Sequence, residues 1–430
     1  MNLVVAEKPS VALSIAKVIG ADRRKDGYYE GNGYKVSWCV GHLVQMSNPD
    51  KYDEKYAKWN LKELPIIPNE YKYEVSKSTK KQFAVLKRLM NEKEVDTIIN
   101  ACDAGREGES IFRLVYQMTD SKKKMKRLWI SSMEDSAIRD GFQNLKDGSV
   151  YDNLFESAKA RAIADWLVGM NISRLYACIY KQYYSVGRVQ TPTLAMIVTR
   201  DDEIDRFKKE KYFTVDISLD GFSLSTDRID DLNEANRLLN AIGKVVEIND
   251  VIKNEKVTKP DLPFDLTTLQ RECNKYFGFS AKQTLDYAQS LYEKKLITYP
   301  RTDSRYLSED MITNTINNII GKHDFDTDRI KIVFNSKKVT DHHAIIPTIS
   351  SMKEDISKLP DSEVKVYKLI LNKLHSSFGY PLIENTTKIV GKIDEYEFTA
   401  SGKTVIDEGF TKYLKEYRTK NNDDTLLPIV

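Results

Sequence analysis

The sequence predicts a multi-domain protein of mixed α/β and α+β class, in which an N-terminal Rossmann-like domain is followed by helical and β-rich domains. Three observations lead to this prediction. Up to about residue 150, buried strand patterns alternate with amphipathic helix patterns, as in a parallel sheet. From residue 151 the chain reads as long helices with few strands. A polar, β-rich pattern then covers residues 212–262 and returns beyond residue 382.

The composition is that of a soluble globular protein. The 430 residues predict about two to four domains, and 41% hydrophobic with 30% charged residues fits a packed, water-exposed fold. No run of about 18 apolar residues occurs, so we expect no membrane span. The N-terminus lacks the basic and apolar regions of a secretory signal. The four cysteines form no CxxC pair, which argues against a zinc knuckle or disulfide framework and favours the cytoplasm.

The net charge of +3 is too small to indicate a nucleic-acid-binding protein by itself. Basic runs at residues 122–127 and 206–211 could follow a phosphate backbone. Such runs are more often solvated surface, so charge alone leaves the kind of partner open.

The N-terminal strand pattern ends at two charged residues. Residues 2–6 read as a buried strand, and a helix pattern starts near Pro9. Glu7 and Lys8 therefore fall at the carboxyl end of a strand and just before a helix N-terminus, where α/β proteins present reactive groups and favour anions. An exposed Glu–Lys pair in a turn is an equally simple interpretation.

A second strand ends in an acidic turn. Residues 95–102 read as a buried strand that leads into Asp103-Ala-Gly-Arg-Glu-Gly-Glu109 and then a helix. Asp103, Glu107 and Glu109 carry the hard oxygen ligands that Mg²⁺ takes, usually one or two carboxylates completed by water and substrate phosphate. The alternative is an acidic helix N-terminus that serves the helix dipole. A further strand is predicted at residues 127–130.

The chain between the two β-rich stretches is predicted to be helical. Residues 259–263 have the composition of a linker or hinge. Two capping-box patterns follow, Thr267 to Gln270 and Ser280 to Gln283, and each predicts the start of an amphipathic helix.

The second of these helices leads to the segment at residues 296–304, Leu-Ile-Thr-Tyr-Pro-Arg-Thr-Asp-Ser. Pro300 biases Tyr299 away from helical backbone angles, and extended backbone places Tyr299, Arg301 and Asp303 on one face. Tyrosine can form covalent intermediates and arginine grips phosphate oxygens, so this arrangement suits attack on a phosphate. In a chain with 24 tyrosines, a loop with a half-buried ring is the alternative.

Two other sites carry candidate phosphate contacts. Arg188 stands just before a predicted helix start, where Thr191 is expected as N-cap and Pro192 as the first helical residue. His342 and His343 are adjacent and point in different directions in regular structure, so a shared metal ion is not expected. One histidine is expected to contact phosphate and the other to be structural.

In their order along the chain, these motifs resemble those of the type IA DNA topoisomerases, and more closely the bacterial topoisomerase III branch. The resemblance covers essentially the whole chain. The segments that carry it are residues 5–10, 103–109, 185–193, 297–304 and 342–348.

The resemblance implies a Toprim domain at residues 1–150, followed by the domains of a type IA toroid. It implies a helical DNA-binding domain that begins at residues 151–211 and a discontinuous β-rich domain at residues 212–262 and 382–430. Residues 263–381 would form a helical domain with the nucleophilic tyrosine. Since the cores of relatives run further, we expect the C-terminal completion of the first helical domain to be absent from this chain.

The resemblance also implies a mechanism. A tyrosine, here Tyr299, attacks single-stranded DNA and becomes a 5′-phosphotyrosyl ester, and the released 3′-hydroxyl later reseals the strand without ATP. Arg301 and Lys8 would stabilise charge on the phosphate. Glu7 would be the general acid for the leaving 3′-oxygen.

Mg²⁺ is the implied cofactor, held by Glu7, Asp103 and Glu107. Contacts with the DNA backbone are expected from Arg174, Arg188, Gln190 and His342. Many relatives carry a second aspartate where this chain has Gly105, which throws more metal contact on Glu107 and Glu109. We therefore expect weaker Mg²⁺ binding without loss of function.

The leading hypothesis is a Mg²⁺-dependent type IA topoisomerase that relaxes negatively supercoiled DNA or decatenates DNA. A Toprim primase or nuclease would explain Glu7 and Asp103 but leaves Tyr299 and Arg301 without a role. A truncated remnant that only binds single-stranded DNA is the third hypothesis. DNA is the expected partner, a bacterial cytoplasm with its nucleoid or a mobile element is the expected location, and a helicase partner is left open.

Overall fold

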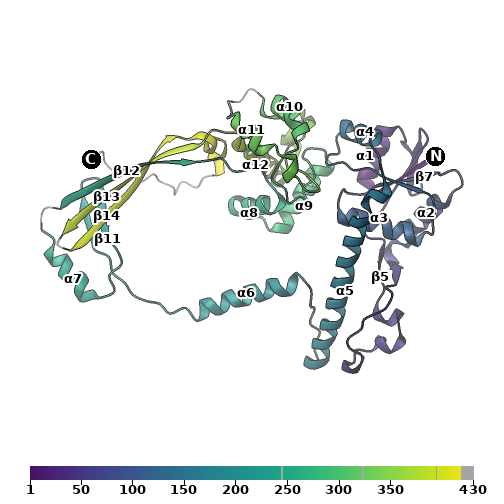
Figure 1. Cartoon of the computed structure of the whole chain (residues 1–430), viewed down its shortest axis with the longest axis horizontal. Helices are drawn as coiled ribbons and strands as arrows, with labels where there is room; N and C mark the ends of the chain where they lie inside the picture. Colours follow the sequence, from purple (N-terminus) through teal and green to yellow (C-terminus); the bar gives the residue numbers. More distant parts are fainter. Residues whose placement is uncertain (244–245, 322–323, 394, 418–430) are drawn as a thin grey trace. The chain divides into compact units, whose positions relative to one another are not determined.

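The computed structural model describes residues 1–243, 246–321, 324–393 and 395–417 of the chain (Figure 1). Contacts within the chain divide it into two units. The N-terminal unit comprises residues 1–206 and 289–299, and the C-terminal unit comprises residues 207–288 and the chain from residue 300 onward. Tyr299 therefore belongs to the N-terminal unit.

A seven-stranded sheet lies in the middle of the N-terminal unit. In spatial order its strands are β2 (Arg23–Lys25), β3 (Tyr28–Gly31), β4 (Tyr34–Trp38), β1 (Asn2–Ala6), β7 (Thr97–Ala101), β8 (Lys124–Arg127) and β9 (Lys146–Asp147). β1 is parallel to both of its neighbours, β4 and β7, and β7 is parallel to β8. Leu3, Val4 and Val5 of β1 are fully buried, as expected for a central strand covered on both faces.

The helices of this domain are α1 (Pro9–Ile19), α2 (Lys80–Asn91), α3 (Arg106–Met118) and α4 (Asp135–Gln143). Leu86 of α2 and Phe112 of α3 pack with Leu3 of β1 in one hydrophobic core, and α1 contacts β4 and α4. α1 ends at Ile19, because its C-cap Gly20 adopts a left-handed φ of 73° and the Gly20 N–H closes the last turn.

The N-terminal unit also has an arm that lies alongside a long helix. The arm contains the paired strands β5 (Val44–Met46) and β6 (Tyr73–Val75), with the short 3₁₀ helices η1 (Pro49–Lys51), η2 (Glu54–Ala57) and η3 (Leu61–Glu63) between them. The helix is α5 (Asp152–Tyr180), which lies alongside the arm in Figure 1. Its Trp166 donates to the Ser47 carbonyl over 3.1 Å, and its Asn171 bonds both backbone groups of Ile66. These bonds fasten the arm to α5.

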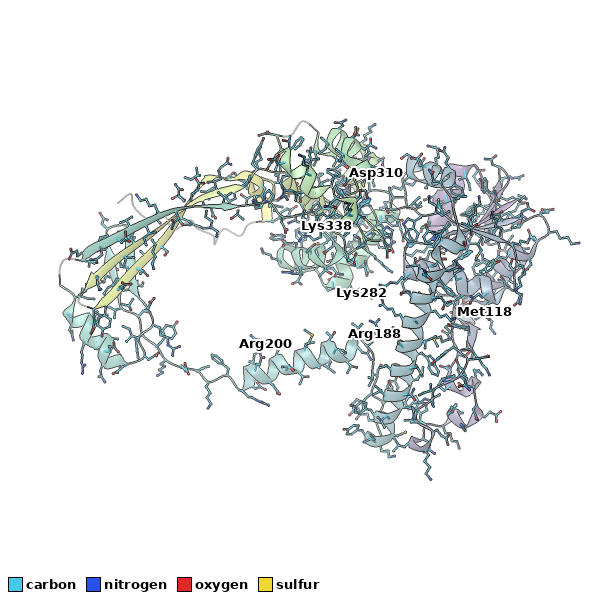
Figure 2. All side chains as sticks on the ribbon, in the orientation of Figure 1. Met118, Arg188, Arg200, Lys282, Asp310 and Lys338 are labelled. Carbon is cyan, nitrogen blue, oxygen red and sulfur yellow. The ribbon has the colours of Figure 1, made fainter. Side chains whose placement is uncertain are left out.

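The helix that follows, α6 (Gln190–Asp205), contains no buried residue. Figure 2 labels Arg188 at its N-terminal end and Arg200 farther along it. The helix begins at Gln190, earlier than predicted, and Thr191 is not its N-cap. The Thr191 hydroxyl instead accepts the Gly187 N–H over 3.1 Å and closes the preceding turn.

The C-terminal unit contains a five-stranded antiparallel sheet. In spatial order its strands are β10 (Asp216–Leu219), β11 (Phe222–Thr226), β14 (Tyr396–Asp407), β13 (Leu382–Ile393) and β12 (Glu247–Thr258). Helix α7 (Leu232–Ala241) supplies Ala235 and Leu238 to the core on this sheet, where they meet Leu224 and Phe398. The sheet thus combines strands that precede and strands that follow a helical stretch.

That helical stretch contains α8 (Leu266–Phe277), α9 (Ala281–Glu293), α10 (Ile312–Thr315), α11 (Asp328–Val333) and α12 (Asp361–Ser377). Its core gathers Leu307, Val333, Ile346 and Phe378. The end of α9 and the chain up to Tyr299 pack with the N-terminal unit. Within the described ranges, no helix is both long and apolar enough to cross a membrane.

Candidate active site

Glu7 and Asp103 lie side by side at the carboxyl ends of two parallel strands. The register pairs Ala6 of β1 with Ala101 of β7, so the residues that follow each strand are neighbours. The Asp103 N–H donates to Glu7 Oε2 over 3.2 Å, and Glu7 is 7% exposed. Parallel pairing thus brings together two carboxylates that are far apart in the sequence.

Glu107 is directed to a different partner. It lies in the first turn of α3, largely exposed, with its Oε2 3.2 Å from His42 Nε2. The hydrogen bond with His42 holds the pKa of Glu107 below its ordinary value, although partial burial opposes this. Glu107 is therefore an ionised carboxylate at the rim of the site.

Glu109 has a structural environment and corrects the sequence prediction that it shares metal contact. It is 1% exposed, and both of its oxygens are bonded inside the protein. Its partners are Asn100 Nδ2 at 2.9 Å, Arg113 Nε at 2.8 Å and Arg127 Nε at 3.1 Å. Two buried arginines thus compensate one buried carboxylate, and Glu109 is not directed to an open site.

Arg127 organises the backbone of the acidic turn, which the sequence analysis missed. The guanidinium is 1% exposed, and burial lowers its pKa while Glu109 opposes this. It donates to the carbonyls of Asn100, Cys102, Leu128 and Asp103 over 2.6 to 3.1 Å. The basic run at residues 122–127 is therefore not simply solvated surface, because its last residue holds the strand end that carries Asp103.

The two glycines of the acidic turn differ in their surroundings. A Cβ atom on Gly108 would lie 2.0 Å from the Asp103 carbonyl oxygen, so only glycine allows α3 to pack this closely on the turn. A Cβ atom on Gly105 would meet nothing within 4 Å. Gly105 has extended backbone with φ 163°, which any residue adopts.

Tyr299 is held against this domain by the segment at residues 289–299. Its N–H donates to the Ser131 carbonyl over 3.1 Å, and the side chain is 8% exposed. The ring packs edge-on against Tyr292, with centroids 5.4 Å apart. Burial raises the pKa of Tyr292 well above its ordinary value, and the charges of Asp103 and Glu7 raise it further. The tyrosine pair therefore lies within electrostatic reach of both strand-end carboxylates.

Ion pairs fasten the same segment to the domain. Lys8 Nζ lies 2.9 Å from Glu293 Oε1, and Ser10 Oγ donates to Glu293 Oε2 over 3.3 Å. Lys295 Nζ lies 2.7 Å from Asp135 Oδ1. Lys8, which the sequence placed beside Glu7, is thus bound to the helix that leads to Tyr299.

Arg301 and His342 belong to the C-terminal unit. His342 is buried, and its carbonyl accepts the Thr302 hydroxyl over 3.0 Å. Asp303 accepts the Thr340 hydroxyl over 2.5 Å. The chain that follows Arg301 is thereby attached to the histidine segment, which the sequence did not indicate. The neighbouring His343 is buried, and burial lowers its pKa.

The remaining candidate DNA contacts lie on and after α5. Arg188 Nε is 2.6 Å from Asp165 Oδ1, and Gln190 Nε2 donates to Ser185 Oγ over 2.8 Å. The guanidinium of Arg174 lies 5.2 Å from the centre of the Trp59 ring and donates to the Tyr56 carbonyl over 2.8 Å.

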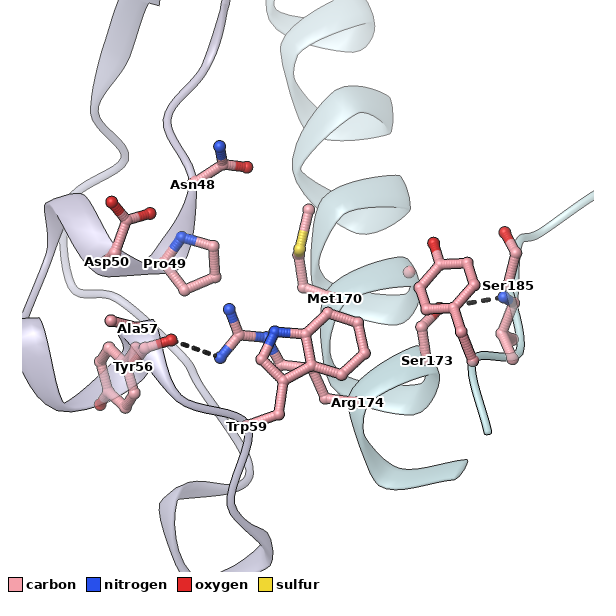
Figure 3. A pocket seen from close by; sticks show the side chains of 13 residues that line it. Asn48, Pro49, Asp50, Tyr56, Ala57, Trp59, Met170, Ser173, Arg174 and Ser185 are labelled. Atoms are coloured by element: carbon pink, nitrogen blue, oxygen red, sulfur yellow. Dashed lines mark hydrogen bonds between the residues drawn. The ribbon is translucent and has the colours of Figure 1, made fainter. Parts of the chain in front are cut away.

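Arg174 lines a cavity of about 550 Å³ between the arm and α5 (Figure 3). Trp59 and Tyr183 contribute aromatic rings to it, with centroids 5.8 Å apart, and Asp50 adds a carboxylate. Sequence reasoning missed this cavity, because its lining residues come from segments with no shared pattern. The only signal in the sequence for an aromatic surface here is that Trp59 follows Tyr52 and Tyr56 closely.

The carboxylates of the site match Mg²⁺ in kind. Glu7 and Asp103 supply hard oxygen ligands, and Mg²⁺ commonly takes one or two carboxylates with water and phosphate. In the part of the chain that the structure describes, no three His, Cys, Asp or Glu side chains are grouped closely enough to hold a metal ion. The donor set therefore fits a two-carboxylate site rather than a preformed cage.

Comparisons with known proteins agree with each other. A family model described as Toprim domain matches residues 2–133, and one described as DNA topoisomerase matches residues 149–430. The chain is 40% identical to DNA topoisomerase 3 of Bacillus cereus, over 99% of this chain and 61% of that protein. It is 41% identical to DNA topoisomerase 3 of Bacillus licheniformis, over 98% of this chain and 61% of that protein.

The chain thus spans about three fifths of the length of the curated relatives that it matches. Its structure is similar to that of full-length topoisomerase I from Thermotoga maritima. That similarity has a TM-score of 0.74 and 26% sequence identity, and it covers 97% of this chain and 68% of the other.

Proposed function

Because this chain belongs to the type IA DNA topoisomerase family, with an N-terminal Toprim domain, we propose that it cleaves and reseals single-stranded DNA through Tyr299. One observation carries the proposal. The buried pair Tyr292 and Tyr299 is held on the Toprim domain, where the charges of Asp103 and Glu7 reach Tyr292. A tyrosine beside a group of carboxylates is suited to phosphoryl transfer, since one group can attack while another moves a proton.

The proposed reaction exchanges one phosphodiester for another. The Tyr299 oxygen attacks the DNA phosphorus, its proton passes to water, and the bond from phosphorus to the 3′-oxygen breaks. Glu7 protonates the leaving 3′-oxygen, and the 5′-phosphate remains on Tyr299. Resealing is the reverse, with the 3′-hydroxyl as nucleophile and Tyr299 as leaving group. The tyrosyl ester conserves the energy of the broken bond, so no ATP is needed.

Cationic side chains stabilise the phosphate in this proposal. Lys8 at the end of β1 and Arg301 after the nucleophile offset the charge that grows on the phosphate oxygens. A bound Mg²⁺ would supply positive charge to offset the phosphate and would help to orient the strand. Asp103 would hold the ion together with Glu7 in its ionised form, and Glu107, in the first turn of α3, would join them after leaving His42.

Single-stranded DNA is the proposed substrate, within negatively supercoiled or linked molecules. The proposed backbone contacts are Arg174, Arg188, Gln190 and His342. Trp59 and Tyr183 support base stacking beside Arg174, because aromatic faces accept any base. Since the relatives are bacterial proteins, the proposed location is a bacterial cytoplasm.

Trapping of a covalent intermediate tests the proposal. The protein is incubated with a single-stranded oligonucleotide labelled at either end and with Mg²⁺, then quenched with denaturant. We expect the label on the 3′ side of the cut to migrate with the protein, since the 5′-phosphate of that fragment is attached. Tyr299→Phe is expected to abolish the adduct, whereas Tyr287→Phe should retain it, because Tyr287 lies on the preceding helix α9 with its ring against Phe279. Cleavage that survives Tyr299→Phe would favour a nuclease instead.

A plasmid assay separates cleavage from strand passage. Negatively supercoiled plasmid is incubated with the same proteins, and the topoisomers are resolved on a gel. Relaxation that depends on Tyr299 supports the full topoisomerase reaction. Adducts without relaxation would favour the alternative that this length of chain binds and cuts DNA without completing strand passage.

A further inference from the structure

We propose that Glu293 is a positioning residue that holds the Lys8 ammonium until a DNA phosphate takes its place. The inference rests on the proposed function, because Lys8 meets a phosphate only if DNA is bound at this site. It adds a residue from helix α9 to the machinery that the strand ends provide.

Glu293 is bound through both of its oxygens. Oε1 accepts from Lys8 Nζ at 2.9 Å and from Gln289 Nε2 at 3.0 Å, and Oε2 accepts from Ser10 Oγ at 3.3 Å. The Lys8 and Glu293 side chains are 33% and 28% exposed. The pair is therefore shielded enough from solvent for its attraction to contribute to binding energies, and it is still accessible to a ligand from solvent.

The Glu293 carboxyl is ionised at neutral pH. Burial alone would raise its pKa, but hydrogen bonds from Lys8 and Gln289 and the charge of Lys8 hold the pKa below its ordinary value. The full negative charge of Glu293 consequently lies next to the Lys8 ammonium.

The position of this carboxylate is one that suits a phosphate. Lys8 is the N-cap of α1, and Ser10 lies in the first turn of that helix. A helix N-terminus favours anions, and an ammonium and a hydroxyl add two further donors. The Glu293 carboxylate therefore occupies a place in which a DNA phosphate could accept the same hydrogen bonds.

The Glu293 carboxylate and a DNA phosphate therefore compete for the Lys8 ammonium. The Lys8 ammonium cannot hold the Glu293 carboxylate and a phosphate at full strength together, and the two anions repel each other. DNA binding must therefore break the contact between Lys8 and Glu293, and the release of Glu293 loosens one attachment of the segment that carries Tyr299.

The pair of Lys295 and Asp135 offers a matched control. It is also an ion pair, at 2.7 Å, and it fastens the same segment to the Toprim domain. Its acidic member, Asp135, pairs with Lys295, whereas Glu293 accepts from Lys8 and Ser10. If Glu293 only fastened the segment, loss of either acidic residue would have the same effect.

The test measures single-stranded DNA binding by the full chain, with Tyr299→Phe present in every protein so that no cleavage occurs. Fluorescence anisotropy of a labelled oligonucleotide is recorded over a range of salt concentrations. Glu293→Gln is expected to bind about three- to tenfold more tightly at low salt. The slope of log K against log salt should change by less than about 0.7, since Lys8 contacts the phosphate in both proteins, whereas Lys8→Ala should make the slope less negative by about 0.7. Asp135→Asn should change affinity by less than about twofold.

A double-mutant comparison completes the test. In a Lys8→Ala background, Glu293→Gln should lose most of its gain, because the competing cation is absent. An equal gain in that background, an equal gain from Asp135→Asn, or no gain from Glu293→Gln would each overturn the role of Glu293. Those results leave DNA binding intact and so leave the proposed function standing. Absence of single-stranded DNA binding by every protein would overturn both.

Discussion

Residues of one type take different roles in this site according to their surroundings. Glu107 and Glu109 lie close together at the start of α3, yet Glu107 is at the surface beside His42 while Glu109 is buried between arginines. Spacing in the sequence does not distinguish them. Burial and partners assign Glu109 to the stability of the Toprim domain and leave Glu107 as a candidate ligand.

Substitution of these two glutamates should separate stability from metal binding. Glu109→Gln leaves Arg113 and Arg127 buried with reduced compensation and is expected to lower the free energy of unfolding by about 3–5 kcal/mol. Glu107→Gln alters an exposed side chain and should change stability by about 0.5 kcal/mol or less. Urea unfolding curves measure both values. Equal effects of the two substitutions would contradict the assignment of Glu109 as a structural residue.

Gly105→Asp tests whether the missing aspartate weakens Mg²⁺ binding. The position has extended backbone and open space around its Cβ, so the side chain can be accommodated. We expect oligonucleotide cleavage and resealing to reach half their maximum at a lower Mg²⁺ concentration than in the natural chain. Gly108→Ala is the matched control, and its clash with the Asp103 carbonyl should impair both reactions at every Mg²⁺ concentration. An unchanged Mg²⁺ requirement for Gly105→Asp would show that the lack of a further carboxylate is not what limits binding.

At the scale of the element, the segment predicted as a linker at residues 259–263 acts as an attachment point. Asp261 pairs with Arg305 at 2.8 Å and with Lys373 of α12 at 3.1 Å. Burial would raise the pKa of Asp261, but the hydrogen bond from Arg305 and the charge of Lys373 together lower it to about 2. The start of the helical stretch is thereby tied to α12 rather than hinged beside it.

This ion-pair group should make the stability of the C-terminal unit depend on pH. The folded pKa of Asp261 lies near 2, below its ordinary value of 3.8. The stabilisation is therefore fully present above that ordinary value and is lost as pH falls toward 2. Because more than half of the side chain is exposed, solvent screening limits the effect to about 1 kcal/mol. Asp261→Asn should lower the unfolding midpoint at pH 6 and converge with the natural chain near pH 2. A constant difference across this range would contradict the assignment.

The elements show which local patterns predict structure reliably. The Ser280 to Gln283 capping box is confirmed by its two reciprocal bonds, at 2.9 and 3.2 Å. The box predicted at Thr267 to Gln270 is wrong, because Asp265 caps α8 and pairs reciprocally with Thr268. Aspartate caps helices as well as serine or threonine does. A search for a capping box that begins with Ser or Thr therefore missed the start of α8 at Asp265.

The strand predicted at residues 127–130 is displaced for a similar reason. β8 occupies Lys124–Arg127, where lysine and arginine obscure the strand pattern. Arg127 is buried only because Glu109 and several carbonyls compensate its charge. Such compensation comes from residues remote in sequence, so hydrophobic periodicity cannot report it.

At the scale of the whole molecule, the pair of strand-end carboxylates could be predicted from the sequence patterns, whereas the attachment of Tyr299 beside them could not. The meeting of Glu7 and Asp103 follows from strand patterns, because the carboxyl ends of parallel strands share one edge. The attachment of Tyr299 to that edge depends on Ser131, Lys8 and Glu293, which belong to separate patterns. Only the order of motifs, through family resemblance, connected the tyrosine to the carboxylates.

Tyr299 lies at the boundary between the two units of the chain. Residues 289–299 group with the Toprim domain, whereas the earlier part of α9 and Arg301 group with the C-terminal unit. Tyr299, the proposed nucleophile, therefore lies at the point where the chain passes from one unit to the other. In the proposed reaction, polar contacts of the kind formed by Lys8 and Lys295 would govern how this short segment holds to the carboxylates.

The central claim is that Tyr299 carries the DNA, and the most direct measurement is the mass of the trapped adduct. After incubation with oligonucleotide, denaturation and digestion by nuclease and trypsin, the peptide of residues 296–301 contains Tyr299 as its only tyrosine. Tyr292 falls in a different tryptic peptide, at residues 283–294. We predict the added mass of a 5′-linked nucleotide on the first peptide and none on the second. Nucleotide on the Tyr292 peptide, or DNA cleavage with neither peptide modified, would contradict the account.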